Sequence, residues 1–249
     1  MAETTGLSRR VFLGSSAVAA ATVSLPVAQA ATKTAEFKRG AVILFQGDSI
    51  TDVGRNRSLE AQPNHPGALG DGYPFLIASY LLATRPELGL KIYNRGISGN
   101  RVPDLDARWQ ADSIDLKPDV LSILIGVNDI WHKLNGRYDG TIEQYEQQYA
   151  ALLERTRRAL PDTRIVVCEP FVLRCGAVNE KWFPEFDHRR AAARRQAEAA
   201  GVTLVPFQTM FDEAVAKSSD PAYWAADGVH PTLAGHAAMA MKWLETVCG

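Results

Sequence analysis

Short apolar runs recur along the chain, and longer segments with helical spacing separate them. Residues 41–45 are continuously apolar, which is typical of a strand buried on both faces. Similar runs lie at residues 91–94, 120–125, 165–168 and 202–205. The pattern therefore predicts about five short buried strands.

The segments between these runs predict helices. Residues 73–84 are mostly apolar, and residues 185–200 end before Gly201, where a helix can stop. Residues 141–160 place Tyr145 and Leu152 on one face, and Thr141 with Gln144 forms a capping-box pattern. A final helix is marked by Leu233, Ala237, Met241 and Leu244.

Strands that alternate with helices predict a parallel sheet with helices on both faces. We therefore expect an α/β fold, a three-layer flavodoxin-like domain with right-handed crossovers. In such sheets the ligand crevice lies at the carboxyl ends of the strands. Polar residues that directly follow a strand are thus the first candidates for chemistry.

Three polar motifs follow predicted strands, and a fourth precedes the final helix. They are Gly47-Asp48-Ser49-Ile50-Thr51, Asn94-Arg95-Gly96-Ile97-Ser98-Gly99, Gly126-Val127-Asn128-Asp129 and Asp227-Gly228-Val229-His230. The first three must share one edge of the sheet, because parallel strands end on the same side. Each motif alone is common in turns, so the combination carries the argument.

These residue types suit acyl transfer. A serine hydroxyl needs a neighbouring base, and a histidine oriented by a carboxylate supplies one. Ser49, His230 and Asp227 fill those three roles. The backbone N–H groups of Ser49 and Gly99 and the Asn128 amide would form an oxyanion hole. A metal-dependent phosphodiesterase that uses Asp48, Asp227 and His230 is an alternative.

The motifs, in this order and spacing, resemble those of the SGNH (GDSL-type) hydrolase superfamily. The resemblance extends over essentially the whole chain after residue 30. It implies a catalytic triad of Ser49, Asp227 and His230 and an oxyanion hole of Ser49, Gly99 and Asn128. It also implies that no metal or organic cofactor is needed. The GxSxG sequence of α/β-hydrolases is absent around Ser49.

A closer resemblance is to acetylxylan and xylo-oligosaccharide acetyl esterases of this superfamily. It is carried by Gly72-Tyr73, Ala107-Arg108-Trp109 and Gly235-His236 beside the four motifs. It implies a small-molecule or oligosaccharide ester as substrate. Trp131 and Trp224 are candidate sugar-binding residues, with core packing as the alternative for each. A lysophospholipase, a thioesterase, a general short-chain esterase and a non-catalytic carbohydrate-binding protein are the competing functions.

The N-terminus predicts export. Arg9-Arg10 precedes a mildly apolar stretch, and Ala28-Gln29-Ala30 offers a cleavage site, which together indicate a twin-arginine signal peptide over residues 1–30. Residues 31–249 would form one domain that is periplasmic or secreted. The stretch is too short for a confident membrane span, so we expect no stable membrane insertion after signal removal.

Composition narrows the partners further. The net charge of −1 gives no nucleic-acid-binding surface, and a homo-oligomer is compatible with the sequence. The three cysteines are an odd number and do not indicate a disulfide framework; whether Cys168 and Cys175 pair in an oxidising compartment is left open by the sequence. Some residues receive no catalytic role here: solvated turn arginines at 55, 57 and 101, structural or surface histidines at 65, 132, 188 and 236, and a core tryptophan at 109.

Overall fold

The structure is a computed structural model that describes Met1, residues 37–218 and residues 220–249. The signal peptide expected over residues 1–30, apart from Met1, lies outside the described residues, as does the start of the expected domain at residue 31.

The sheet has five parallel strands in the order β2-β1-β3-β4-β5. The strands are β1 (Val42–Gly47), β2 (Lys91–Asn94), β3 (Val120–Leu124), β4 (Arg164–Cys168) and β5 (Thr203–Val205). The chain moves to opposite sides of β1 when it forms β2 and β3, so the sheet order reverses at β1. In open α/β sheets such a reversal opens a crevice at the carboxyl ends of the strands.

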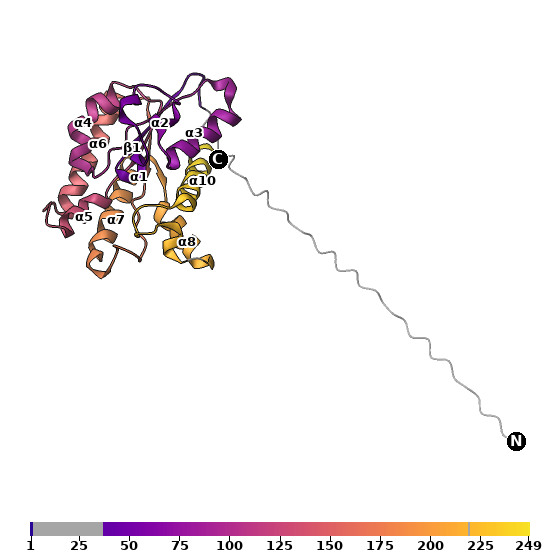
Figure 1. The fold of residues 1–249 in the computed structure, drawn as a ribbon, viewed down its shortest axis with the longest axis vertical. Coiled ribbons are helices and arrows are strands. Elements are labelled where there is room, and N and C mark those ends of the chain that lie inside the picture. Colours follow the sequence, from indigo (N-terminus) through magenta and orange to yellow (C-terminus); the bar gives the residue numbers. More distant parts are fainter. Residues whose placement is uncertain (2–36, 219) are drawn as a thin grey trace. The chain divides into compact units, whose positions relative to one another are not determined.

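Alternating residues of each strand face different helical layers. Ile43 and Phe45 pack with α3 (Tyr73–Thr84), α8 (Phe207–Ser218) and α10 (Leu233–Cys248). Leu44 points the other way, toward α4 (Val102–Trp109), α6 (Ile142–Ala159) and α7 (Glu185–Ala199). Figure 1 shows α4 and α6 on one side of β1, and α3 and α10 on the other. The predicted three-layer α/β fold with five parallel strands is confirmed.

The remaining elements are short and surround the strand ends. They are α1 (Ser49–Asp52), α2 (Pro66–Leu69), α5 (Val127–Leu134), α9 (Pro221–Trp224), η1 (Arg57–Leu59), η2 (Pro86–Leu88), η3 (Gln110–Ile114) and η4 (Glu180–Trp182). Two of them, α1 and α5, follow β1 and β3 directly and carry polar motifs. Their first turns thus lie at the carboxyl edge of the sheet.

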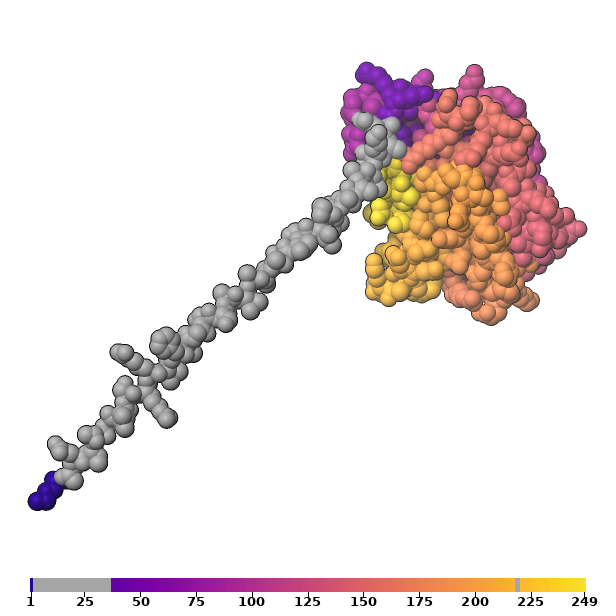
Figure 2. All heavy atoms as spheres, turned by 180° about the vertical axis from the view of Figure 1, so that it is seen from behind, coloured from indigo at the N-terminus to yellow at the C-terminus, as the bar shows by residue number. Residues whose placement is uncertain are grey.

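The predicted helices exist, but the buried face of the last one differs from its apolar stripe. The capping box at Thr141 and Gln144 is present in both directions. In α10, however, Leu233 is 78% exposed and Met241 is 66% exposed. His236, together with residues three, four, seven and eleven positions later, faces the core instead. Figure 2 shows residues of α10, in yellow, at the surface of the molecule. The homo-oligomer expected from the sequence stays a prediction.

The pairing of Cys168 with Cys175, which the sequence left open, is absent from the structure. Cys168 is buried, and its Sγ lies 3.4 Å from Ser122 Oγ. The Cys175 thiol donates to the carbonyl oxygen of Ala225 at 3.3 Å. Each thiol is free in the structure, because the two side chains meet different neighbours. No helix in the described part of the chain is long and apolar enough to span a membrane.

Candidate active site

The first polar motif turns β1 into α1. Asp48 is the N-cap of α1, and its carboxylate accepts the N–H of Ile50 at 3.0 Å. Ser49 is thereby the first residue of the helix and remains half-buried at the sheet edge. Burial raises the pKa of Asp48 to about 7, and the Ile50 N–H and the nearby His230 act against this rise.

The Asp227–His230 motif forms a tight turn that sets both side chains. Oδ1 of Asp227 accepts the N–H groups of Val229 and His230 at 2.9 and 2.7 Å, and Oδ2 lies 2.7 Å from Nδ1 of His230. Gly228 makes the turn possible with φ +85°, because a Cβ there would lie 2.5 Å from the carbonyl oxygens of Leu173 and Cys175. The turn therefore presents the imidazole in a fixed orientation.

The His230 ring of this turn lies against Ser49, which is 181 positions earlier in the chain. Ser49 Oγ lies 2.9 Å from His230 Nε2. Partial burial raises the pKa of Asp227, but the hydrogen bonds from the His230 ring and the two N–H groups outweigh it and hold the pKa below its ordinary value. An ionised Asp227 keeps the proton on Nδ1, so Nε2 is free to accept the Ser49 proton.

The triad lies in an open part of the surface. The His230 side chain is 44% exposed and that of Asp227 is 39% exposed. A bulky ester can therefore approach Ser49 without passing through a channel. Asp48 does not complete a metal site, because its carboxylate caps α1, and the described residues hold no group of three metal ligands. The geometry thus gives no support to the phosphodiesterase alternative.

Gly99 and Asn128 lie in neighbouring segments at the same edge. Gly99 has φ +83°, and the nearest atom to a Cβ placed there would be His132 Cε1 at 3.9 Å, so the space above it is open. The amide nitrogen of Asn128, in the first turn of α5, donates to the carbonyl oxygen of Asn100 at 3.1 Å. This bond holds Asn128 against the loop that carries Gly99.

Only one of the two candidate sugar-binding tryptophans lies against the triad. The ring of Trp131 is 5.7 Å from that of His230 and 5.6 Å from that of Trp182. Trp224 stacks edge-on against Tyr223 at 5.1 Å and lines a hollow between α8 and α10 that includes no triad residue. Trp224 is the last residue of the short helix α9 (Pro221–Trp224).

Helix α5 also presents a residue that the sequence analysis placed among structural histidines. Asn128, Trp131 and His132 share one face of α5 because they are three and four residues apart. The His132 ring is half-buried beside Gly99, and burial together with Arg101 lowers its pKa. A neutral imidazole there would offer both a donor and an acceptor to a substrate hydroxyl. The sequence signal that could have placed His132 beside the site is its position four residues after Asn128 in the same helix.

Other expected structural residues occupy the core. His236 is buried, and its Nδ1 accepts the N–H of Tyr73 at 3.2 Å, which ties α10 to the start of α3. Burial, with the nearby His230, lowers the pKa of His236 to about 4, so its ring is neutral. Trp109 is fully buried and donates to Thr156 Oγ1 at 2.9 Å. Both structural predictions are confirmed.

Arg55 and Arg101 are not solvated turn residues, which corrects the expectation, whereas Arg57 is exposed as expected. Arg55 has no exposed side-chain surface; it donates to Asp52 at 3.1 Å and to the carbonyl oxygen of Gly96 at 2.7 Å. Arg57 contacts Asp52 at 2.5 Å, although it is 48% exposed. Arg101 pairs with Asp104 at 2.8 Å. The three ion pairs join residues that are three to five positions apart, whereas the contact from Arg55 to Gly96 spans 41 positions and depends on the fold.

A parallel α/β sheet with a Ser-His-Asp arrangement at its carboxyl edge defines a serine-type ester hydrolase. Residues 45–238 match the GDSL-like lipase/acylhydrolase family, and the chain belongs to that family. The chain is 38% identical over 214 residues to an acetylxylan esterase of Geobacillus stearothermophilus. The aligned residues cover 84% of this chain and 94% of the relative. The expected family and enzyme class are confirmed.

Solved structures agree with this assignment. A GDSL-like lipase from Parabacteroides merdae superposes with a TM-score of 0.82 at 50% identity, covering 85% of this chain and 97% of that one. Axe2, an acetylxylan esterase from Geobacillus stearothermophilus, gives a TM-score of 0.74 at 36% identity, covering 85% and 95%. Two further Axe2 structures are described as catalytic mutants, in which a histidine or a serine is replaced by alanine.

Proposed function

We propose that the protein removes acetyl groups from xylan, xylo-oligosaccharides or related carbohydrates through an acetyl-enzyme on Ser49. The contact that carries the proposal is the 2.9 Å approach of Ser49 Oγ to His230 Nε2, continued by the 2.7 Å approach of Nδ1 to Asp227. The name of the 38% identical relative supports an acetylated xylan as substrate. The open triad with Trp131 beside it suits a bulky sugar ester.

The reaction proceeds in two balanced halves. Ser49 Oγ attacks the acetyl carbonyl carbon while His230 Nε2 takes its proton, and the oxyanion receives hydrogen bonds from the N–H groups of Ser49 and Gly99 and from the Asn128 amide. The bond to the sugar oxygen then breaks, and His230 returns the proton to that oxygen. Water next attacks the acetyl carbon while His230 Nε2 takes a proton from it; the bond from that carbon to Ser49 Oγ breaks, His230 returns the proton to Ser49 Oγ, and acetate leaves.

The test is acetate release from acetylated xylo-oligosaccharides. Wild type and Ser79→Ala should release acetate at the same rate, because Ser79 is an exposed residue of α3 whose hydroxyl donates to the Phe75 carbonyl oxygen in the same helix. Ser49→Ala should release none above background. Activity retained in Ser49→Ala would contradict the mechanism. A clear preference of wild type for octanoyl over acetyl esters would contradict the substrate class and favour a lipid ester.

We also propose that residues 1–30 direct export of the folded enzyme through the twin-arginine pathway. The Arg9-Arg10 pair and the small residues Ala28-Gln29-Ala30 support this. Replacing both arginines with lysine should retain the enzyme inside the producing cell, whereas wild type should appear in the periplasm or medium with residues 1–30 removed. Equal export of both forms would contradict the pathway.

A further inference from the structure

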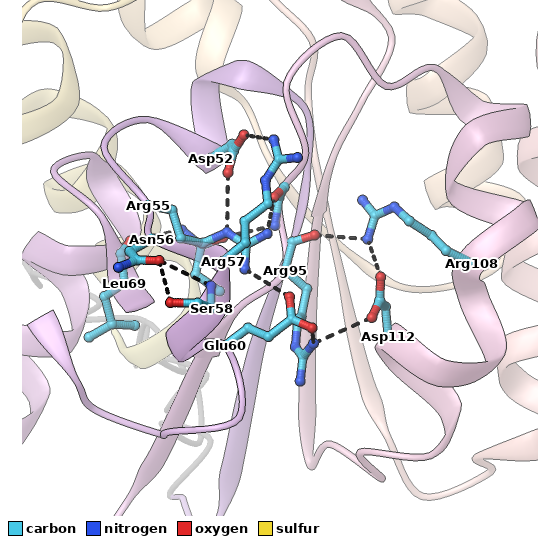
Figure 3. A network of polar contacts seen from close by, with 12 residues as sticks. Asp52, Arg55, Asn56, Arg57, Ser58, Glu60, Leu69, Arg95, Arg108 and Asp112 are labelled. Carbon is cyan, nitrogen blue, oxygen red and sulfur yellow. Dashed lines mark hydrogen bonds and ion pairs between the residues drawn. The ribbon is translucent and has the colours of Figure 1, made fainter. Parts of the chain in front are cut away.

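A cluster of charged side chains joins the ends of β1 and β2 beside the candidate active site. Figure 3 shows Arg108 and Asp112, four residues apart, reaching Arg95 from one side. On the other side of the cluster lie Asp52 and Arg55. None of these side chains contacts a triad residue within the described chain. Asp52 and Arg108 do contact Ser98 and Asn100, the residues before and after Gly99.

Arg108, from α4, binds both strand ends with one guanidinium group. Its Nε donates to Oδ1 of Asn100 at 2.8 Å, and a terminal nitrogen donates to the carbonyl oxygen of Arg95 at 2.8 Å. The same nitrogen reaches Gln46 Oε1 at 2.9 Å, and the other one lies 3.4 Å from the carbonyl oxygen of Gly47. One side chain thus connects the strand before Ser49 with both ends of the segment that contains Gly99.

Asp52 holds that segment from the opposite side. Its Oδ2 accepts the N–H of Ser98 at 2.9 Å and the Ser98 hydroxyl at 2.8 Å. Asp52 belongs to α1, the helix that Ser49 begins. The residue before Gly99 is therefore bound to the helix of Ser49, and the residue after it is bound to Arg108.

This double attachment matters because the segment has little regular structure of its own. It leaves the sheet after β2, and two of its backbone hydrogen bonds are those from Ile97 to Gly47 and from Asn100 to Ile97, at 3.0 and 3.1 Å. Gly99 has φ +83°, and glycine has more backbone freedom than any other residue type. An oxyanion donor is effective only when it is held in place before the charge develops.

We propose that Arg108 is a positioning residue, which together with Asp52 fixes the Gly99 N–H relative to Ser49 so that both donate to one oxyanion. The inference rests on the proposed oxyanion hole. Arg108 itself does not touch the substrate; it acts through Asn100 and Gly47. Loss of Arg108 should therefore weaken transition-state binding and leave ground-state binding of the ester nearly unchanged.

The test compares kcat and KM of Arg108→Met, Arg108→Lys and a control. Arg155→Met is the matched control, since Arg155 joins α6 to Asp106 of α4 by an ion pair at 2.8 Å without contacting the Gly99 segment. With p-nitrophenyl acetate, Arg108→Met should lose about 100-fold in kcat with KM within about threefold of wild type. Arg155→Met should match wild type. Arg108→Lys should recover part of kcat, because a lysine replaces some donors but not the fork.

Near-ultraviolet circular dichroism and melting curves establish that each variant is folded at the assay temperature. A folded Arg108→Met with kcat within about threefold of wild type would overturn the inference. If Arg108→Met does not fold, Arg108→Gln, which removes both the charge and the fork, decides by the same threshold. Ser49→Ala separates the two proposals: activity in Ser49→Ala removes the proposed function, whereas an inactive Ser49→Ala beside a fully active Arg108→Met removes only the role of Arg108.

Discussion

Replacing Asp227 with asparagine tests how the triad fixes the histidine tautomer. Oδ1 of Asp227 accepts two backbone N–H groups, and Oδ2 faces Nδ1 of His230. In Asp227→Asn the side-chain oxygen keeps the two backbone hydrogen bonds, so the NH2 group must face Nδ1. Nδ1 then acts as acceptor, the proton moves to Nε2, and His230 can no longer accept the Ser49 proton.

The expected loss follows from that switch. The turn keeps its backbone contacts, so the fold and KM should change little, while kcat should fall about 10⁴-fold, or about 5.5 kcal/mol in the barrier. The assay is hydrolysis of p-nitrophenyl acetate at constant temperature. Asp220→Asn is the control, because Asp220 accepts the N–H of Ala222 at 3.0 Å in a similar turn but faces no imidazole. A loss of less than about tenfold in Asp227→Asn would show that Asp227 does not set the tautomer of His230.

Three further variants test the surroundings of the site. Trp131→Ala should lower kcat/KM for acetylated xylo-oligosaccharides about tenfold and for p-nitrophenyl acetate less than about twofold, since the ring lies beside His230; equal losses would contradict a sugar-facing ring. Asp48→Asn keeps the cap to Ile50 but cannot ionise. Because the pKa of Asp48 is raised from 3.8 to about 7, the unfolded chain releases this proton first, and wild type loses stability as pH rises between those values. The free energy of unfolding of Asp48→Asn should therefore exceed that of wild type increasingly from pH 4 to pH 7, by up to about 4 kcal/mol at pH 7. A difference that is constant over this pH range would contradict the raised pKa. Arg55→Met should lower the free energy of unfolding in urea by about 3 kcal/mol, because it leaves part of the buried charge of Asp52 uncompensated; an unchanged value would show that the pair adds nothing.

The sequence pattern predicted the layers well because it reports burial directly. Apolar runs of four to six residues matched the strands to within one or two residues, and the helix at Tyr73–Thr84 has the predicted bounds. The rule that parallel strands end at one edge also brought Ser49, Gly99 and Asn128 together. The final helix was harder: Leu233 and Met241 are apolar but exposed, while His236 is polar and buried.

The polar supports of the site could not be predicted, because they depend on contacts between distant segments. Arg108 contacts Gln46, which is 62 positions away, and Arg55 contacts Gly96, which is 41 positions away. A turn arginine beside a strand end looks solvated in sequence, and only the fold shows the distant oxygen atoms to which it donates. The place of Trp224 beside α8 and α10 likewise depends on how distant segments pack, which periodicity along the chain does not fix.

The most direct measurement of the central claim is covalent labelling of the nucleophile. An aryl phosphonate ester reacts with an activated serine, and digestion followed by mass spectrometry locates the adduct. We expect one adduct per chain, on Ser49, and we expect labelling to be slowed by about 10³-fold or more in His230→Ala. Stoichiometric labelling at another residue, or labelling of Ser49 at an unchanged rate without His230, would contradict the account.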